Sequence, residues 1–503
     1  MMRFDFDNSF ARELPGFCVK WAPDRVPRPQ LRYLNHALAE ELRLDTGQQD
    51  TATLADMLSG NRVPPGAEPI AQAYAGHQFG QFSAQLGDGR ALVIGEVMDG
   101  HGKCRDIAFK GSGPTPFARN GDGKAALGPM LREALISEAM HALGIPTTRT
   151  LAVVATGETV RREKLLPGAN LTRIAASHIR VGTFEYYAAR GDHERVRRLA
   201  DYTIARHDPG LVGQNGRYLD FLGAVIDRQA ALVAQWMGVG FIHGVMNTDN
   251  MSISGETIDY GPCAFMEAYD PKAVFSSIDQ HGRYAYQNQP SIAQWNLARL
   301  AESLLPLLAD QEKDAVVLAT DAITNFDDLY QRYWLDVMRA KLGFNGRTPS
   351  RDDEDQALIA EWLGLLQRNR VDFTLAWRHL ADAAEGSLAS LRNLFADRVA
   401  LDGWLAKWGA RCASEDNHTQ SDESHSAAVT RAKTMRRSNP WLIPRNHCVE
   451  DALTAASDEN DFGPFEQLLT ALKHPYEADA KFVRFSNPAS ESFTANYCTF
   501  CGT

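Results

Sequence analysis

The chain has 503 residues, of which 44% are hydrophobic and 23% are charged, so it can bury large cores and is not intrinsically disordered as a whole. Lys and Arg number 52 against 63 Asp and Glu, which gives a formal net charge of −11. An acidic balance argues against a protein that coats nucleic acid or an anionic membrane.

The sequence carries few signs of export or membrane insertion. The N-terminal residues alternate charged and aromatic side chains without the apolar run of a secretory signal. No stretch approaches the roughly 18 consecutive apolar residues that a membrane span needs. Seven scattered cysteines are too few for a disulfide scaffold in a chain of this length. We therefore expect a cytoplasmic protein without nucleic-acid or membrane partners.

The first half of the chain predicts an antiparallel sheet that carries one helix. Turns with glycine separate three short stretches that are typical of a meander: residues 82–86, 90–97 and 106–110. A helix is expected next, with Pro129 in its first turn, Glu133 inside it and Gly144 at its end. A hairpin around residues 156–158 and a strand over residues 172–179 complete the predicted sheet.

The second half of the chain predicts mostly helices. Apolar residues recur with the helical period in four stretches, residues 219–237, 292–304, 358–366 and 465–472. The polar segment 414–426 is expected to be a surface loop or a mobile segment. We divide the chain into an N-terminal extension, a small lobe, a large lobe and a C-terminal extension, over residues 1–70, 71–185, 186–400 and 401–503.

The segment from Phe241 to Gly261 carries the clearest candidates for catalysis and metal binding. His243 at the end of a long predicted helix is followed by Asn250 and, after a predicted hairpin, by Asp259. In protein-kinase-like folds a His-x-Asp loop is followed by an Asn and an Asp that hold metal. Asn250 and Asp259 occupy these positions, and their hard oxygens suit Mg²⁺ bound to a triphosphate.

Upstream residues occur in the order that a nucleotide-binding small lobe needs. Residues 87–89 form a Gly-Asp-Gly turn where a glycine loop would cover phosphates, Lys110 ends the third predicted strand, and Glu133 lies in the following helix. We expect Glu133 to anchor Lys110 in a structural ion pair. The turn alone is more typical of an ordinary hairpin. Together these elements predict an α+β, protein-kinase-like bilobal fold with a helical C-terminal extension.

One element of a kinase is absent from the sequence. Two residues after His243, where kinases carry the Asp that accepts the hydroxyl proton, this chain has Val245. Valine cannot accept a proton, so ordinary transfer of the γ-phosphoryl group loses its general base. Asp249 is the nearest substitute carboxylate, and capping a turn is its alternative role.

Six segments of the chain carry long and specific strings of residues. They are residues 73–80, 109–117, 120–123, 180–184, 243–250 and 288–290. On these strings the chain resembles the selenoprotein O family, also called YdiU. That family consists of pseudokinases that act as protein adenylyltransferases.

The resemblance implies transfer of AMP from ATP to Ser, Thr or Tyr hydroxyls of proteins, with Mg²⁺ or Mn²⁺. It implies a nucleotide bound in a flipped orientation and pyrophosphate as the leaving group. Asn250 and Asp259 match the family's metal ligands, and Asp249 matches its proton acceptor. The implied ATP-binding residues are Gly87, Gly89, Arg90, Lys110, Asp122, Gly123, Arg173, Arg180 and Asp259.

Other interpretations stay open from the residues themselves. Arg173 and Arg180 are also compatible with a solvated sheet face, and residues 122–123 with a plain turn. UTP is an alternative donor, because the sequence does not show what reads the base. A residual phosphotransferase with another base, and a catalytically silent ATP-binding scaffold, are the rival functions.

The tail carries a Cys-x-x-Cys pair, Cys498 and Cys501. This spacing permits a reversible disulfide or half of a metal site. The resemblance implies a redox-active pair, with Cys501 at the position where family members carry selenocysteine. An inert pair is the alternative.

Overall fold

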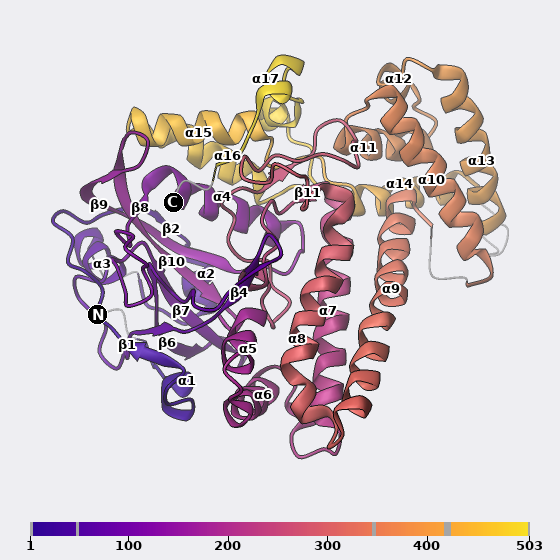
Figure 1. Cartoon of the computed structure of the whole chain (residues 1–503). Helices are drawn as coiled ribbons and strands as arrows, with labels where there is room; N and C mark the ends of the chain where they lie inside the picture. Colours follow the sequence, from indigo (N-terminus) through magenta and orange to yellow (C-terminus); the bar gives the residue numbers. More distant parts are fainter. Residues whose placement is uncertain (1–3, 47–49, 345–348, 417–423, 501–503) are drawn as a thin grey trace.

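The computed structural model describes residues 4–46, 50–344, 349–416 and 424–500. An antiparallel sheet of eight strands lies at the centre of the N-terminal half (Figure 1), in the order β1-β3-β6-β7-β10-β9-β2, with β8 beside β10. The strands are β1 (Cys18–Lys20), β2 (Gln30–Leu34), β3 (Ile70–Gln72), β6 (Ala91–Met98), β7 (Cys104–Lys110), β8 (Ala125–Ala126), β9 (Arg149–Arg161) and β10 (Leu165–Ala175). Residues 1–70 therefore supply both edge strands, β1 and β2, to the sheet.

The first strand of the predicted meander is wrong. Of residues 82–86 only the start is strand, as β5 (Gln81–Ser83), and β5 pairs with β4 (Gly76–Gln78) in a separate hairpin. The main sheet instead places β3 beside β6. Separately, β11 (Phe241–Ile242) pairs with β12 (Ala264–Phe265) and closes the loop that carries His243 and Asp259.

The predicted hairpin around residues 156–158 is also wrong. Strand β9 runs through these residues, and the connection to β10 lies at residues 162–164. The register shifts between Pro167 and Ala169, so residues 156–158 face Gly168 across a bulge. A bulge accommodates the φ of +75° at Gly157 inside a strand, which is why the glycine does not make a turn. The strand expected over residues 172–179 ends at Ala175.

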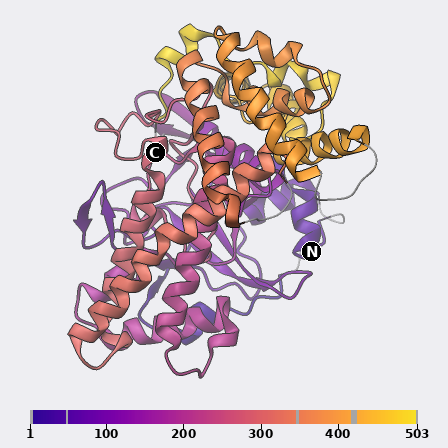
Figure 2. The same ribbon diagram turned by 90° about the vertical axis from the view of Figure 1, so that its right-hand side faces the viewer.

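Most of the longer helices fall into three groups (Figures 1 and 2). Helix α4 packs on β9 and β10, and α15 and α16 pack against α4. Helices α7, α8 and α9 contact one another in a bundle beside the sheet, and α10 to α14 form a group at one end of α9. In the part of the chain that the structure describes, no helix is both long and apolar enough to cross a membrane.

The bounds of the helices follow the chain from end to end. They are α1 (Ser9–Glu13), α2 (His36–Glu41), α3 (Thr51–Leu58), α4 (Leu127–Ala142), α5 (Val181–Ala188), α6 (His193–His207), α7 (Arg217–Val239), α8 (Gln289–Leu308), α9 (Glu312–Leu342), α10 (Asp352–Asn369), α11 (Phe373–Ala384), α12 (Ala389–Asn393), α13 (Arg398–Asp416), α14 (Ser424–Ser438), α15 (Asn446–Asp458), α16 (Gly463–Leu472) and α17 (Glu491–Asn496). The four stretches with helical periodicity fall in α7, α8, α10 and α16, so those predictions are confirmed.

The ends of the helices follow ordinary rules of local structure. Helix α7 buries an apolar stripe that includes Phe221, Leu222 and Val225, and it stops at Gly240, whose φ of 73° lies in the left-handed region. The first turn of α10 carries four carboxylates, which favour the positive end of the helix dipole.

The surface loop predicted over residues 414–426 is wrong at both ends. Helix α13 continues to Asp416 and α14 begins at Ser424, while residues 417–423 lie outside the described part of the chain. The polar end of α13 is helical because Arg431 of α14 binds it, with 3.0 Å to Glu415 and 2.6 Å to Asp416. The low apolar content therefore reflects an ion-paired helix end.

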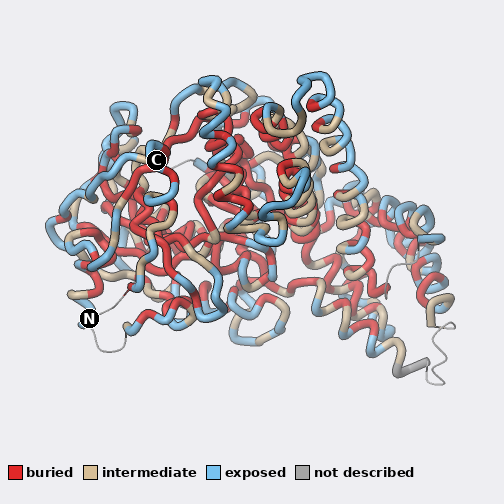
Figure 3. The backbone as a smooth tube through the Cα atoms, turned by 90° about the horizontal axis from the view of Figure 1, so that it is seen from below, coloured by how far each residue is buried: buried red, intermediate tan, exposed pale blue. Residues whose placement is uncertain are grey.

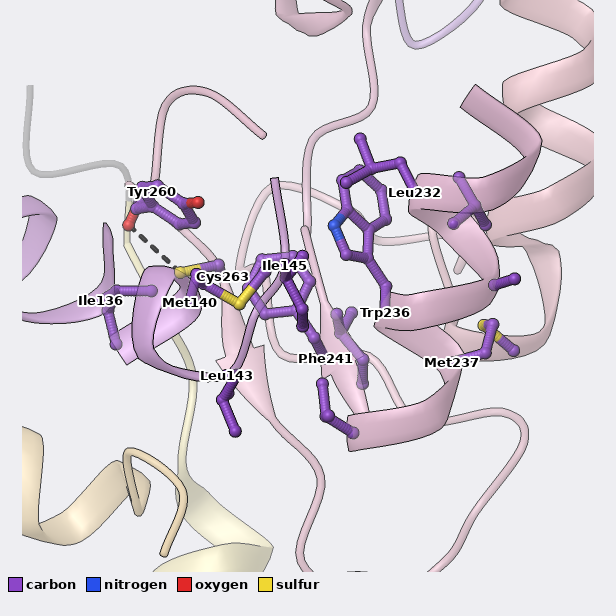
Figure 4. Close-up of a cluster of buried hydrophobic side chains, with 14 of the residues drawn as sticks. Ile136, Met140, Leu143, Ile145, Leu232, Trp236, Met237, Phe241, Tyr260 and Cys263 are labelled. Atoms are coloured by element: carbon purple, nitrogen blue, oxygen red, sulfur yellow. Dashed lines mark hydrogen bonds between the residues drawn. The ribbon is translucent and has the colours of Figure 1, made fainter. Parts of the chain in front are cut away.

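The core that fixes the site lies where α4 meets α7 and β11. Figure 4 shows Met140 and Ile145 in one buried cluster with Trp236 and Phe241. The Trp236 indole donates a hydrogen bond to the Thr257 hydroxyl over 2.9 Å. Buried residues run through the sheet and the inner faces of the helices (Figure 3). This core holds the segment after Thr257 between α4 and α7.

Removing a large side chain from this cluster should destabilise the protein. We expect Phe241→Ala, at a fully buried position, to lower the free energy of unfolding by about 3–5 kcal/mol, because it removes apolar contacts and leaves a cavity. The measurement is thermal and denaturant unfolding. Val399→Ala, at a position 84% exposed, should change the stability by less than about 0.5 kcal/mol. Equal losses in the two variants would contradict this assignment of the core.

Candidate functional site

A cavity of about 610 Å³ opens where β6 begins and β7 ends, between these strands, the start of α4 and the loop after β11. It brings together most of the residues that the sequence singled out, although they lie up to several hundred positions apart. The singled-out residues that line it are Gly89, Arg90, Lys110, Glu133, Arg173, Arg180, Asp249, Asn250, Asp259 and Cys498. Gly87, Asp122 and Gly123 are not among the lining residues.

A cluster of buried charges forms the floor of the cavity. Lys110, the last residue of β7, binds the Glu133 carboxylate of α4 and lies 2.5 Å from the Asp259 carboxylate. Arg173 of β10 approaches the same Asp259 oxygen to 2.9 Å. Burial alone would raise the pKa of Asp259, but Lys110, Arg173 and Arg180 outweigh burial and hold this pKa well below its usual value. Asp259 is therefore a carboxylate at neutral pH.

The backbone around Asp259 is unusual. Asp259 has a φ of 64°, in the left-handed region that residues other than glycine seldom adopt. The hairpin predicted before it does not form, because Ser252 bridges to Arg180 and Thr257 bridges to Thr147 instead. The His243 ring donates a hydrogen bond to the Ile258 carbonyl over 2.9 Å. These contacts fix the direction in which the Asp259 carboxylate points.

Both ends of the Gly-Asp-Gly turn must be glycine, because a neighbouring loop packs closely against them. A Cβ atom on Gly87 would lie 2.5 Å from the Phe117 ring, and one on Gly89 would lie 2.9 Å from the Phe117 carbonyl oxygen. Gly87 also has a φ of 90°. Asp88 between them is buried, and its carboxylate accepts a hydrogen bond from the backbone amide of Gln72 over 3.0 Å. The turn thus holds Gly89 and Arg90 at the cavity wall.

Residues 122–123 lie on the loop that follows Phe117. Asp122 binds Arg162 over 2.7 Å and is partly exposed. A Cβ atom on Gly123 would lie 2.1 Å from the Pro114 nitrogen, so this position accepts only glycine. In this structure the pair shapes the loop at the side of the cavity.

Arg180 is buried at the start of α5, so a solvated sheet face is not its environment. Its guanidinium lies 4.5 Å from the centre of the Tyr74 ring, a cation–π contact. Its Nε atom has no hydrogen-bond partner among the described residues. Arg173 is likewise 3% exposed. Buried cations at a cavity wall are suited to bind an anion such as phosphate.

Asp249 also lines the cavity and lies in the 3₁₀ turn Thr248–Asn250. One of its oxygens accepts a long hydrogen bond of 3.4 Å from Gln78, and the other has no partner among the described residues. Burial raises the pKa of Asp249 to about 6, although Arg180 acts in the other direction. A buried carboxylate with a free oxygen is equipped to accept a proton.

Asn250 and Asp259 offer oxygen ligands to a metal. Asn250 donates its amide hydrogen to the Val245 carbonyl over 3.0 Å, which leaves the amide oxygen for a ligand. Within the described ranges, no cluster of three or more His, Cys, Asp or Glu residues forms a metal site by itself. Two hard oxygens fit Mg²⁺ or Mn²⁺ when phosphate oxygens complete the coordination.

The structure adds lining residues that the sequence did not single out. Tyr74 and Gln78 come from the segment before and within β4, and Asn247 from the loop before Asp249. Their strings, 73–80 and 243–250, did carry the resemblance, which was a usable signal. Ser457 and Asp458 of α15 also line the cavity, and nothing in the sequence links that helix to the site.

The tail closes another part of the wall. Thr499 donates its amide hydrogen to the Phe275 carbonyl over 2.7 Å and accepts one from the Ser277 amide over 2.9 Å. Its neighbour Cys498 is exposed and has no disulfide partner among the residues that the structure describes. Cys501 lies outside the described residues, so the pairing of the two stays a prediction.

Comparison with known proteins decides the family. Residues 1–473 match the family model described as Protein adenylyltransferase SelO. The chain belongs to the SelO family. It is 58% identical over 487 residues to the Protein nucleotidyltransferase YdiU of Chromobacterium violaceum, with 96% of this chain and 99% of that one covered. It is 56% identical to the protein of that name from Cereibacter sphaeroides, over all of both chains. With the one from Methylorubrum populi the identity is 54%, over 99% of each chain.

In this SelO family member, Lys110 should be needed for nucleotide binding. We expect Lys110→Met to weaken ATP binding at least about tenfold, because it removes a buried charge-assisted hydrogen bond donor. The measurement is calorimetric titration with MgATP on protein shown to be folded by circular dichroism. Lys103→Met, at the exposed turn before the same strand, is the matched control. Equal affinity of both variants would refute the role of Lys110.

Proposed function

We propose that this protein nucleotidyltransferase transfers AMP from ATP to Ser, Thr or Tyr hydroxyls of proteins and releases pyrophosphate. One observation carries the proposal: the cavity has Val245 where a kinase has its base, and instead a buried Asp249, one oxygen of which has no partner in the described part of the chain. The family and the names of the relatives support nucleotidyl transfer. The donor and the acceptor class are our inference.

The arrangement of the helices and strands supports the interpretation of the fold as kinase-like. The sheet with α4 corresponds to a small lobe, and the bundle of α7, α8 and α9 to a large lobe. The cavity is lined by residues of the sheet, by α4 and by the loop that follows α7 and β11. Lys110 contacts both Glu133 and Asp259, which is the arrangement of lysine, glutamate and aspartate that protein kinases use. We keep residues 71–185 and 186–400 as the two lobes and residues 401–503 as the extension.

Four cations of the cavity are available to the triphosphate: Arg90, Lys110, Arg173 and Arg180. They neutralise phosphate charge, and an arginine does so with two nitrogens at once. We assign Gly87, Gly89, Asp122 and Gly123 to the loops that border the nucleotide. Mg²⁺ or Mn²⁺, held by Asn250 and Asp259, would neutralise further charge on the phosphate oxygens when bound.

The chemical step needs a base at the α-phosphorus. Asp249 removes the proton from the acceptor hydroxyl, the hydroxyl oxygen bonds to the α-phosphorus, and the bond from that phosphorus to the β-phosphate oxygen breaks. The products are the AMP ester of the protein and pyrophosphate, with the proton on Asp249. This outcome requires the flipped orientation, in which the α-phosphate faces Asp249.

The position of the transferred phosphorus distinguishes this proposal from its rivals. The protein is incubated with ATP labelled at the α- or the γ-phosphate and with Mg²⁺ or Mn²⁺, and protein-bound label is read on a denaturing gel. We expect label from the α-position only. Label from the γ-position only would establish a phosphotransferase, and no label from either, despite ATP binding, would favour a silent scaffold. A parallel incubation with α-labelled UTP tests the alternative donor.

Asp249 should be needed for transfer and dispensable for binding. We expect Asp249→Asn to slow AMP transfer by about 10²–10⁴-fold, the usual contribution of a general base. ATP affinity should stay within about threefold of the wild-type value, since an amide preserves the shape of the carboxylate. Asp220→Asn, on an exposed turn of α7, should leave both quantities unchanged. Undiminished labelling by Asp249→Asn would remove this residue from the mechanism.

A further inference from the structure

His178 is a buried histidine that the proposed mechanism does not use. It lies between β10 and α5, five residues after Arg173 and two before Arg180, and only 2% of its surface is exposed. It does not line the cavity. A buried ring between two cationic residues of the site has no evident packing reason to be a histidine.

The two nitrogens of His178 connect Arg173 to the interior of the protein. The Nε atom of Arg173 donates to Nε2 of His178 over 3.2 Å. On the other side, Nδ1 of His178 lies 2.9 Å from the Asp106 carboxylate. The same Asp106 oxygen accepts the backbone amide of His178 over 2.8 Å. The ring is thus held at both of its nitrogens, and the backbone of the residue is held by the same carboxylate.

This arrangement determines the protonation of the ring. The Arg173 guanidinium has only donors, so Nε2 must be an unprotonated acceptor. Nδ1 then carries the proton and donates it to Asp106. Burial, together with the nearby Arg173, lowers the pKa of His178 even though Asp106 acts to raise it. His178 is a neutral imidazole with its acceptor facing Arg173.

Asp106 is itself immobilised by rigid elements. It lies on β7, four residues before Lys110, and its second oxygen accepts from Arg206 of α6 over 2.5 Å. Arg206 also binds Glu96 of β6 over 2.8 Å. Both carboxylates are almost fully buried. The chain of contacts therefore anchors the His178 ring to the middle of the sheet.

Two partners hold the Arg173 guanidinium at two different nitrogens. Its Nε atom is held by His178 and its Nη1 atom by Asp259 over 2.9 Å. Its Nη2 atom has no hydrogen-bond partner among the residues in the described ranges, and Arg173 lines the cavity. One nitrogen of the guanidinium thus remains for a ligand.

We propose that His178 is a positioning residue, which holds the Arg173 guanidinium so that Nη1 binds Asp259 while Nη2 faces the triphosphate. The inference rests on the proposed function, since it names Arg173 as a phosphate ligand. Without the Nε2 acceptor the guanidinium rotates about its side-chain bonds, and preorganisation for the phosphate is lost. His178 touches neither nucleotide nor acceptor.

Two substitutions separate the two nitrogens of the ring. In His178→Gln the side-chain amide reaches the place of Nε2, so its oxygen accepts from Arg173. In His178→Asn the amide reaches only the place of Nδ1, so it donates to Asp106 and leaves Arg173 without its acceptor. Both variants remove the ring, so a role in packing alone affects them alike.

The experiment measures MgATP affinity by calorimetry and, for AMP transfer, KM and kcat separately. We expect His178→Asn to weaken ATP binding and raise KM about tenfold to hundredfold, and His178→Gln to do so by less than about threefold. On an Arg173→Ala background, His178→Asn should add nothing. Equal losses in the Asn and Gln variants, or an undiminished effect on that background, would overturn the proposal.

A spectroscopic readout does not depend on the proposed function. In protein with ¹⁵N-labelled histidine, the His178 signals are assigned by their loss in His178→Asn. We expect the neutral form protonated at Nδ1 at pH 7. A ring protonated at Nε2, or at both nitrogens, would overturn the inference even if AMP transfer is established. If α-labelled ATP gives no transfer, the binding and spectroscopic results still decide the role of His178.

Discussion

The arrangement of the site depends on the need to pair buried charges around Asp259. Lys110 and Arg173 both bind this carboxylate, and Lys110 also binds Glu133. Charged groups removed from water are costly unless an opposite charge compensates them. These side chains come from β7, β10, α4 and the loop after β11. Pairing them therefore holds four separate parts of the chain in one geometry.

Packing around this cluster supports the same geometry. The core between α4 and α7 holds the Thr257–Cys263 segment in place (Figure 4). The network from Arg206 through Asp106 and His178 reaches Arg173 from the other side. Helices α15 and α16 cover α4. Rigid supports on several sides suit a site in which cations must face phosphate before it binds.

In the proposed mechanism, Asp249 takes the role of the base that is missing at Val245. Both residues line the cavity, and Asp249 keeps one oxygen without a partner among the described residues. Phosphoryl transfer depends largely on positioning and electrostatics. A carboxylate at position 249, four residues after the kinase position 245, is therefore compatible with attack at a different phosphorus of the same nucleotide.

Local patterns in the sequence were sufficient for the four helices with clear apolar periodicity and for the order of the main candidate site residues. Helical periodicity over residues 219–237 predicted α7, because one apolar face is a property of consecutive residues. The Lys110–Glu133 pairing followed from motif order. The hairpin at Gly157 was wrong, since a bulge and a turn use the same residue types. The loop at residues 414–426 was wrong because its partner, Arg431, lies on another helix.

The sequence by itself determined the family, the helices with clear apolar periodicity and the order of the candidate site residues along the chain. Only the tertiary structure decided which edge strands complete the sheet, that α15 and the tail line the cavity, and that His178 stands behind Arg173. The reason is physical. Periodicity and motifs depend on neighbours along the chain, whereas strand order, cavity walls and charge networks depend on contacts between segments far apart in sequence.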